Sequence, residues 1–541
     1  MGPEQTHGRP PQPDRPATGH ALTVVVATDD PITAWQMRCA KRLAAVPGVV
    51  LVGWLQPAAS PTDRDAARAS AEEPTPTEFE NVPLYRNPGA VGADSVDDPQ
   101  VDVCLDLTDR GIAGPIPWAS EMWRFRFGDG LEEDPAHAAL VGYIRGPGVT
   151  RVALVSEPTN VILREGRLQS VSWWTSHPVD RLHRDTEDWP ALVALERVDP
   201  AMRPGLDDAR FGCRQARTPS ARRVADDPLV RLPRSVLIVG AVGRRMRGSL
   251  DVLTRHPDWN VGILPRPIQH VLTDDDLPIT WLPSRTGRFA ADPFGVERDG
   301  AMHVLFEDYD QRLGRGVISH VAVDSAGQVS ETTPVLDPGV HVSYPFLVED
   351  DGAIYMLPET GQAGRLVLYE AVDFPYRWRP ARTLLDDVPA ADASVVKYDG
   401  RWWMFATRTD RGANQNLYIW HAPHLMGPWS AHAANPVKTD ARSARSGGTP
   451  FVADGRLYRP AQDNSGIYGG RLVVNRVDTL TPTGFAERRV KVLQPPKGYP
   501  DGLHTLSAVG GRTLIDGNRR HLVLPVLRRH LVSKLPSMSR S

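Results

Sequence analysis

The sequence predicts a multidomain α/β plus all-β protein, in which a parallel-sheet region is followed by a five-bladed β-propeller. Three observations lead to this fold class. The chain has 541 residues, more than a single hydrophobic core normally serves. Its N-terminal region alternates apolar strands with helical periodicity, whereas short apolar runs between Gly, Asp and Pro turns fill the rest. Among these short runs a single pattern recurs five times, which indicates a repeat architecture.

These changes of character divide the chain. We expect a disordered tail at 1–20, an α/β domain at 21–230, the propeller at 231–530 and a second tail at 531–541. Within the α/β domain, residues 57–100 are rich in Ala, Pro, Asp and Glu, as is typical of a mobile insertion.

The α/β domain starts with an apolar strand, a helical pattern over 31–46 and a second apolar strand. Strand, helix and strand at this spacing form a βαβ unit, so we expect a parallel sheet. Apolar runs mark the expected strands: 22–28, 49–55, 101–107, 139–145, 150–156 and 160–174.

Each of the five repeats has a strand, a tight turn and a second strand. The turn glycines are Gly300, Gly352, Gly400, Gly455 and Gly511, between 48 and 56 residues apart. Four turns are Asp-Gly and one is Gly-Gly, the dipeptides that two-residue hairpin loops prefer. A period near 50 residues, with further strands in each unit, fits a four-stranded blade. A β-sandwich is the alternative, but a sandwich needs no repeat.

Counting outward from each two-residue turn predicts which residues face each other. Asp292 is set opposite Glu307, Tyr344 opposite Glu359, and Asp392 opposite Thr407. In a propeller these strand ends gather at one mouth of the central channel. The register therefore predicts a group of acidic side chains at that mouth.

Facing carboxylates repel each other, so Asp292 and Glu307 need an explanation. A cation, an arginine or a shared proton between them would supply one, and a shared proton would raise one pKa. Arg408 and Arg459 are the candidate partners. The alternatives are that the pair splays into solvent or that a longer turn shifts the register.

Acidic groups around a funnel suit a sugar, because carboxylates accept hydrogen bonds from its hydroxyls. Asp292, Glu359 and Asp392 lie on consecutive blades and are the predicted catalytic groups, at the separation of roughly 6.5 to 9.5 Å that inversion requires. Tyr344 is expected to pack on the sugar ring. His504 is expected to bind a ligand hydroxyl or a metal ion, or else to be a structural hydrogen-bonding group.

The glycines of residues 442–451 predict a mobile loop over the ligand.

The composition of the chain excludes several kinds of partner and compartment. The formal net charge of −3 gives no basic field for nucleic acid. Three widely spaced cysteines, Cys39, Cys104 and Cys213, fit neither a metal motif nor a disulfide framework. No apolar run is long enough to span a bilayer, and the first residues lack the apolar core of a signal peptide. We therefore expect a cytoplasmic protein with no cofactor.

"FAADPFGVERDG", "FEDY", "HVSYPFLVEDDGAIYMLPET" and "WNVGI" resemble the propeller-like N-terminal region of plant glucosamine inositolphosphorylceramide transferases. The resemblance covers about residues 255–525 and implies a role in glycan metabolism. It does not extend to the separate domain in which those proteins carry their glycosyltransferase. More remotely, the layout is similar to five-bladed family 43 glycoside hydrolases. That similarity implies Asp292 as base, Asp392 as the group that tunes pKa and Glu359 as acid, although the blade order of the acid departs from that family.

"LTVVVATDD", "VDVCLDLTD" and "GPGVTRVALVSEPTNVILREGRL" resemble Rossmann-like formyltransferase domains of the methionyl-tRNA and sugar-nucleotide type. Those enzymes use an Asn, a His-Pro-Ser motif and a later Asp. The corresponding stretch here is "WRFRFGDG", where Asp129 is the one acid, and the later position holds Thr159 or Asn160. The missing base and oxyanion donor predict an inactive domain.

The leading hypothesis is a carbohydrate- or glycolipid-related protein whose propeller binds a sugar at its central channel, either with or without processing it. Its partners would be a sugar or glycolipid head group. One alternative is an interaction platform for a glycosyltransferase partner. The other is a formyltransferase acting on an amino sugar.

Overall fold

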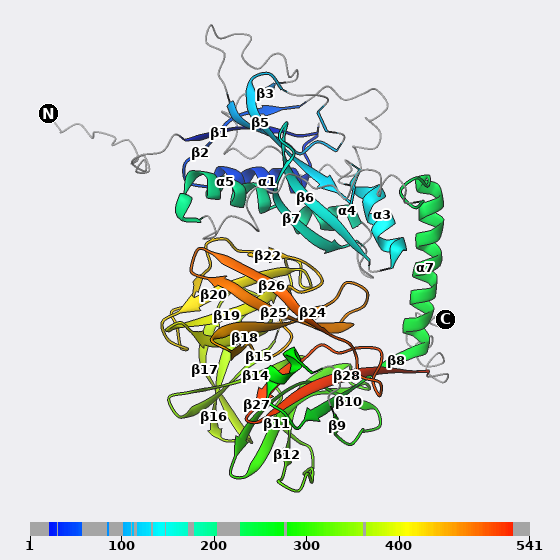
Figure 1. Cartoon of the computed structure of the whole chain (residues 1–541), viewed down its shortest axis with the longest axis vertical. Coiled ribbons are helices and arrows are strands. Elements are labelled where there is room, and N and C mark those ends of the chain that lie inside the picture. Colours follow the sequence, from blue (N-terminus) through cyan, green and yellow to red (C-terminus); the bar gives the residue numbers. More distant parts are fainter. Residues whose placement is uncertain are drawn as a thin grey trace, which may run out of the picture. The chain divides into compact units, whose positions relative to one another are not determined.

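The computed structural model describes residues 21–522 with gaps (Figure 1). The gaps are at 30, 57–83, 86–100, 110, 113–115, 131–133, 147, 171–177, 203–227, 275–277 and 361–363. Both predicted tails, and the predicted insertion apart from Leu84–Tyr85, therefore lie outside the described residues.

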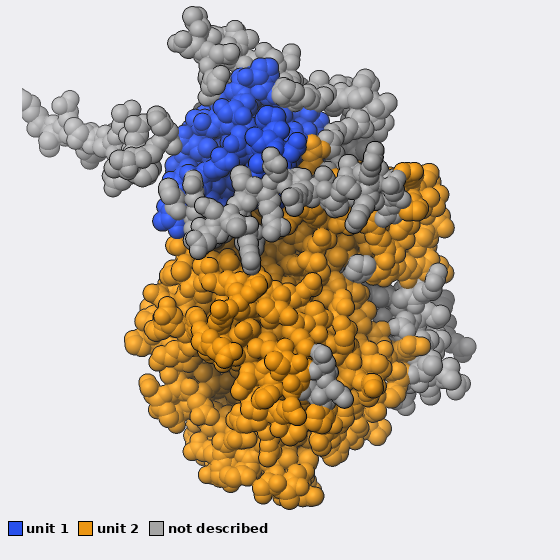
Figure 2. Space-filling model, in the orientation of Figure 1, with its two compact units in different colours: residues 1–125, 154–163, 187–201 blue, residues 126–153, 164–186, 202–541 orange. Residues whose placement is uncertain are grey.

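Contacts within the chain divide it into two compact units, coloured separately in Figure 2. The first unit comprises 1–125, 154–163 and 187–201, and the second comprises 126–153, 164–186 and 202–541. All strands of the propeller belong to the second unit. The domain boundary expected at residue 230 stays a prediction.

The α/β region contains a sheet of order β3-β2-β1-β4-β5-β6-β7. Strand β1 pairs in parallel with β2 and β4, and β4 pairs in parallel with β5. The expected βαβ unit and parallel sheet are confirmed for these strands. The strand bounds are β1 Leu22–Ala27, β2 Val49–Leu55, β3 Leu84–Tyr85, β4 Val101–Asp106, β5 Ala119–Phe127, β6 Val149–Glu157 and β7 Val161–Gln169.

One expected strand of this region is a helix. Residues 139–145 lie in α3, because Asp134 accepts hydrogen bonds from the backbone N–H groups of Ala136 and His137 at 3.0 and 3.1 Å. Pro135 occupies the first turn, where a missing N–H costs nothing. A short apolar run cannot distinguish a strand from a buried helix, and the cap decided between them.

The remaining helices flank or follow the sheet, and none of those described is both long and apolar enough to cross a bilayer. The helix bounds are α1 Ala34–Ala44, α3 Pro135–Arg145, α4 Pro178–Arg184, α5 Trp189–Val198 and α7 Arg234–Thr254, with short 3-10 turns η3 Pro200–Met202 and η4 Ile268–Leu272.

The predicted five-bladed β-propeller is confirmed by five separate antiparallel sheets. Blades 1 to 4 follow chain order: β10-β11-β12-β13, β14-β15-β16-β17, β18-β19-β20-β21 with β22 beside β20, and β23-β24-β25-β26. Blade 5 has the order β27-β28-β8-β9, so strands from both ends of the propeller segment form one sheet. This pairing closes the ring.

The blade strands have these bounds: β8 Arg255–Leu264, β9 Thr280–Trp281, β10 Arg288–Arg298, β11 Ala301–Asp310, β12 Arg315–Val323, β13 Thr333–Leu336, β14 Ser343–Asp350, β15 Ala353–Glu359, β16 Leu366–Asp373, β17 Arg377–Leu385, β18 Ala390–Tyr398, β19 Arg401–Arg408, β20 Asn416–Ala422, β21 Ser430–Ala431, β22 Lys438–Thr439, β23 Phe451–Ala453, β24 Arg456–Asp463, β25 Arg471–Leu480, β26 Phe485–Leu493, β27 Leu506–Val509 and β28 Arg512–Leu522. Buried apolar side chains, such as Phe294, Phe346 and Met404, pack between neighbouring blades.

In blades 1 to 3 the predicted register holds near the turn and then shifts by one residue. In blade 1, Phe294 pairs with Leu305 as expected, but a β-bulge follows and Ala291, not Asp292, pairs with Glu307. The bulged residue Asp292 has a φ of +50°, in the left-handed region that most residues avoid.

The same correction applies to the next two blades. Ser343 instead of Tyr344 pairs with Glu359, and Ala391 instead of Asp392 pairs with Thr407. Tyr344 and Asp392 have φ values of +47° and +49°. Three blades thus carry one bulge at the same place, and strained backbone of this kind is often found where a side chain is aimed at a functional site.

Candidate functional site

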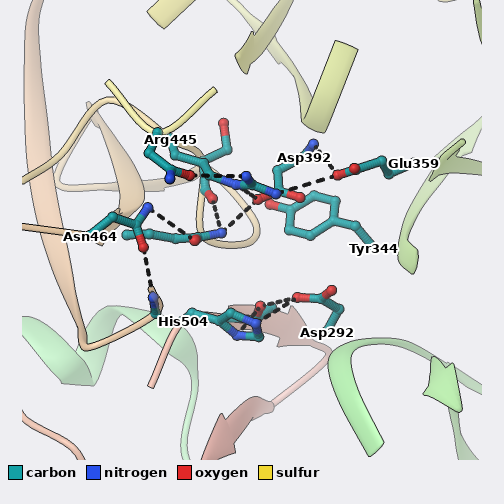
Figure 3. Close-up of polar contacts among 12 residues, drawn as sticks. Asp292, Tyr344, Glu359, Asp392, Arg445, Asn464 and His504 are labelled. Atoms are coloured by element: carbon teal, nitrogen blue, oxygen red, sulfur yellow. Dashed lines mark hydrogen bonds and ion pairs between the residues drawn. The ribbon is translucent and has the colours of Figure 1, made fainter. Parts of the chain in front are cut away.

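Four of the predicted acidic residues do converge where the first strands of the blades meet. Figure 3 shows Asp392, Glu359 and Arg445 grouped beside Asp292 and His504. Glu307 belongs to the same cluster, since its carboxyl interacts electrostatically with Asp292. The acids come from β10, β11, β15 and β18, and all are buried or nearly so.

Asp392 is the carboxylate that stays ionised. Its Oδ2 accepts hydrogen bonds from Arg445 Nε and Gln462 Nε2, each at 2.6 Å. Burial alone would raise the pKa of Asp392, but the charge and hydrogen bond of Arg445 outweigh burial and hold the pKa below its ordinary value.

Glu359 is the neighbour that holds its proton more tightly than a free carboxyl. Its Oε2 accepts the backbone N–H of Asp392 at 3.1 Å and lies 3.6 Å from Arg445 Nη2. Burial, followed by the negative charge of Asp392, raises the pKa of Glu359 well above its ordinary value. A proton donor and an ionised carboxylate therefore stand side by side.

Asp292 titrates between these extremes. Its Oδ1 accepts a hydrogen bond from Thr505 Oγ1 at 2.7 Å, and its backbone N–H donates to Asp516 Oδ2 at 3.2 Å. Burial raises the pKa of Asp292 to about 6, while the positive charge of His504 opposes the rise. Asp292 can thus gain and lose a proton close to neutral pH.

His504 carries the second positive charge of the cluster. Its Nδ1 lies 2.5 Å from Asp516 Oδ2, and its ring stacks on Trp259 with a centroid distance of 4.0 Å. Burial alone would lower the pKa of His504, but Asp516 and then Asp292 raise it to about 9. The imidazole is therefore protonated at neutral pH.

Asp292, His504 and Asp516 each offer one ligand atom, and these atoms lie within 4.8 Å of one another. In the structure, Asp516 Oδ1 accepts the backbone N–H groups of His504 and Thr505, and its Oδ2 lies 2.5 Å from His504 Nδ1. With the pKa of His504 at about 9, Asp516 and His504 form an ion pair, and a metal ion would have to displace the imidazole proton from it.

The predicted arginine partners are elsewhere. Arg408 forms two hydrogen bonds with Asp410, at 3.0 and 2.8 Å. Arg459 is fully buried and binds Glu487 at 2.9 and 2.6 Å. Each arginine is taken by a carboxylate of its own blade, so neither pairs with the central acids.

The repulsion expected between the carboxyl groups of Glu307 and Asp292 is relieved without an arginine. Burial, and next the negative charge of Asp292, raises the pKa of Glu307 well above its ordinary value. Burial and the charge of Asp292 thus favour the neutral form of Glu307, whose carboxyl lies 3.7 Å from His341 Nε2.

Tyr344 does not offer its ring to a ligand. It is fully buried, with its ring edge-on to Phe294 at a centroid distance of 4.8 Å. Its hydroxyl bonds Ser394 Oγ at 2.8 Å and accepts the backbone N–H of Gly448 at 2.7 Å. The bulge turns this side chain into the core, where it holds the loop that carries Arg445.

That loop, which the sequence predicts to be mobile, is packed in the structure. Arg445 lies in it beside the acids, and Ser446, Gly447 and Gly448 are buried around it. A Cβ at Gly448 would collide with the backbone of Leu506, so the glycine permits close packing.

Sequence reasoning also missed Tyr468, an aromatic residue at the cluster that is 48% exposed. The guanidinium carbon of Arg445 lies 5.3 Å from the centre of its ring, and the His504 ring meets it edge-on at 5.6 Å. Buried Asn464 holds the base of its loop by accepting the N–H of Gly469 at 2.7 Å. An aromatic beside two glycines was the signal available in the sequence.

Fold and site together define a five-bladed β-propeller with a buried acid–base cluster where its blades converge. Residues 271–499 match the family model described as the N-terminal region of glucosamine inositolphosphorylceramide transferase 1. The resemblance stated from the sequence is thereby confirmed for the C-terminal region.

Two similar plant proteins bear that name. The protein of Oryza sativa subsp. japonica is 35% identical over 239 residues, which are 43% of this chain and 30% of the relative. The protein of Arabidopsis thaliana is 34% identical over 226 residues, 41% of this chain and 29% of the relative. The chain thus spans less than a third of the length of these relatives.

Solved structures similar to this chain include glycoside hydrolases. A thermostable family-43 glycoside hydrolase is 13% identical with a TM-score of 0.32, over 42% of this chain and 85% of that one. A glycosyl hydrolase from Bacteroides ovatus is 13% identical with a TM-score of 0.35, over 48% and 93%. Likeness at this level assigns no residue a role, and the strand pairings of this chain establish its architecture.

Proposed function

We propose that the propeller binds a sugar or a glycolipid head group at the central cluster and exchanges a proton with it. The observation that carries this proposal is the contrast between adjacent carboxyls. Glu359 has a pKa well above its ordinary value, while Asp392 beside it has a lowered one. Surroundings that give two neighbouring carboxyl groups very different pKa values are typical of acid–base sites.

The roles follow from these protonation states. In a hydrolysis, Glu359 would protonate the glycosidic oxygen as its bond to the anomeric carbon breaks. Asp292, with a pKa of about 6, would take a proton from the water whose oxygen bonds to that carbon. Asp392, held ionised by Arg445, would keep the proton on Glu359 and bind a sugar hydroxyl.

The ligand class is supported by two further observations. Tyr468 offers a partly exposed ring next to the acids, and aromatic faces commonly line sugar sites. The plant relatives are named glucosamine inositolphosphorylceramide transferases, a name that pairs a sugar with an inositol-containing lipid, which favours a glycolipid head group as ligand.

Calorimetric titration of the full chain with mono- and oligosaccharides tests the proposal. We expect saturable binding that Asp292→Asn and Asp392→Asn each weaken at least about tenfold, because each removes a charged hydrogen-bond acceptor from the site. Asp299→Asn is the matched control, since Asp299 has the same chemistry at an exposed turn. The absence of saturable binding by the wild-type chain would count against the proposal.

A second function, a platform for a glycosyltransferase partner, is favoured by the comparison itself. The matching model describes the N-terminal region of a transferase, and the chain spans only 30% of such a relative. Isolation of one stoichiometric glycosyltransferase partner, together with no sugar binding, would favour this function over the first.

For the α/β region we propose a formyltransferase-type domain without transfer activity. The parallel strands β1, β2, β4 and β5 support this class. Asp129 lies 2.9 Å from Arg145 and 3.3 Å from Arg167, so it is engaged by two cations. Turnover of formyl-tetrahydrofolate with an amino sugar acceptor would refute the proposal and restore the formyltransferase alternative.

We also keep the proposal of a cytoplasmic location. Cys39 and Cys104 are buried free thiols, which suits a reducing compartment. Fractionation of cells that express the full chain would test it.

A further inference from the structure

Helix α7 exposes apolar side chains in a way that a solvated helix does not. Val239 is 72% exposed and Met246 is 68% exposed, while Val236, Ile238 and Val242 are each about half exposed. In an α-helix these positions fall on one side, because successive residues turn by about 100°. They define an apolar face that we call the α7 face.

The opposite side of α7 is attached to α3, which Figure 1 draws beside it. Leu237 is fully buried, and Arg244 donates hydrogen bonds to the carbonyl oxygens of Tyr143 and Ile144 at 2.7 and 3.1 Å. The guanidinium of Arg244 also lies over the ring of Tyr143 at 5.1 Å. Since this contact uses the other side of the helix, the α7 face is not needed to hold α7 in place.

The charge of this segment is one-sided. Between Leu229 and Leu250 the sequence has five arginines and neither Asp nor Glu, and Asp251 is the one acid of α7. Arg234 pairs with Asp134 and Arg244 binds α3, so the segment remains net positive after these contacts. The whole chain, in contrast, carries a formal net charge of −3. An apolar helix face within a net positive segment is complementary to a surface that is apolar inside and anionic outside.

We propose that α7 docks this protein on an anionic lipid bilayer by burying the α7 face at the boundary between head groups and acyl chains. From Val236 to Met246 the face extends about 15 Å at 1.5 Å per residue, which suits a helix lying in the plane of the surface. The net positive charge of the segment contributes attraction to anionic lipids.

A second copy of the chain is a less suitable partner for the α7 face than an anionic bilayer is. Pairing two α7 faces would bring two acid-free, arginine-rich segments together, and their like charges repel. An acidic protein partner remains a distinct outcome of the test. The docking proposal does not depend on the sugar site.

The full chain should be sedimented with phosphatidylcholine vesicles that contain or lack phosphatidylserine. We expect binding only to the vesicles with phosphatidylserine, weakened by added salt because screening removes the attraction between arginines and lipid. Val239→Gln together with Met246→Gln should reduce partitioning about tenfold or more, since two exposed apolar side chains are lost from the buried face.

Leu313→Gln is the matched control, because Leu313 is 70% exposed on a propeller turn and lies outside the α7 face. The variants should keep the circular dichroism and unfolding midpoint of the wild type. Equal partitioning of the double variant and the wild type would overturn the proposal. Two further results would overturn it if the wild type does not bind the vesicles. One is a dimer in sedimentation velocity that the double variant abolishes and the control does not. The other is capture of one acidic protein that is lost in the same way.

Discussion

Asp292 and Asp392 occupy the same bulge position in two blades, with φ values of +50° and +49°, yet their acidities move in opposite directions. The cause is the cation that each one meets. Asp392 receives a hydrogen bond from Arg445 at 2.6 Å, whereas His504 lies 3.8 Å from Asp292. Repetition of the backbone therefore places equal side chains in unequal surroundings, and those surroundings make one an anion and the other a group that titrates.

The His504–Asp516 contact gives a pH dependence of stability. The pKa of His504 is raised from 6.5 to about 9, so the folded protein binds this proton more tightly than the unfolded chain. Its stabilisation is complete below pH 6.5 and is lost as the pH rises through about 9. The urea midpoint of the wild type should fall over that interval, whereas His504→Gln should show a flatter profile there. Parallel profiles for the two proteins would contradict the assignment.

At the scale of the element, the hairpin is what local sequence predicts best. The Asp-Gly turns at Asp299, Asp351, Asp399 and Asp454 all have positive φ values at both turn residues. The strand pairs next to them have the register counted from the turns. Turn chemistry acts within a few residues, so it is visible in a single sequence.

The change Gly352→Val tests the role of the turn conformation. Gly352 has a φ of +79° with nothing near a Cβ built on it, so the cost of a side chain there is conformational. We expect a loss of about 1 to 2 kcal/mol in urea unfolding, because a β-branched residue avoids this region. Gly511→Val is the control, since Gly511 also has open space but no positive φ. An equal loss in both variants would show that the turn conformation is not the cause.

Prediction of the site failed where the chain departs from regular pairing. The bulge at Asp292 moves the facing residue by one position, and no turn signal reports it. Arg445 and Tyr468 lie in loops, where the repeat spacing does not apply. The acidic cluster was predictable because Asp292, Glu359 and Asp392 end or begin repeated strands. Of the two cations that set its chemistry, His504 was singled out from the sequence and Arg445 was not.

At the scale of the whole molecule, blade 5 decides whether the propeller is a ring. Strand β28 pairs with β8 from Thr513–Leu264 to Leu522–Arg255, so residues about 250 apart share one sheet. The sequence predicted five hairpins and a ring of blades but not this pairing, because β8 lies outside the repeated hairpins. Closure removes the sheet edge that a linear row of blades would expose.

Truncation tests the closure. A chain that ends at Gly511 lacks β28, so β8 loses its long partner and the central cluster loses Asp516. We expect broad, non-cooperative thermal unfolding and loss of sugar binding. A chain that ends at Leu522 keeps every described strand and should unfold like the full chain. Cooperative unfolding of the shorter chain would show that the ring does not need this strand.

Because β8 is paired along its whole length only by β28, a ribosome making this protein must release almost the whole propeller before its first strand gains that partner. During that interval the nascent β8 has an unpaired edge and can pair with other chains, including other copies in the same polysome. Chaperone occupancy during translation should accordingly begin as β8 leaves the exit tunnel and end once β28 has emerged.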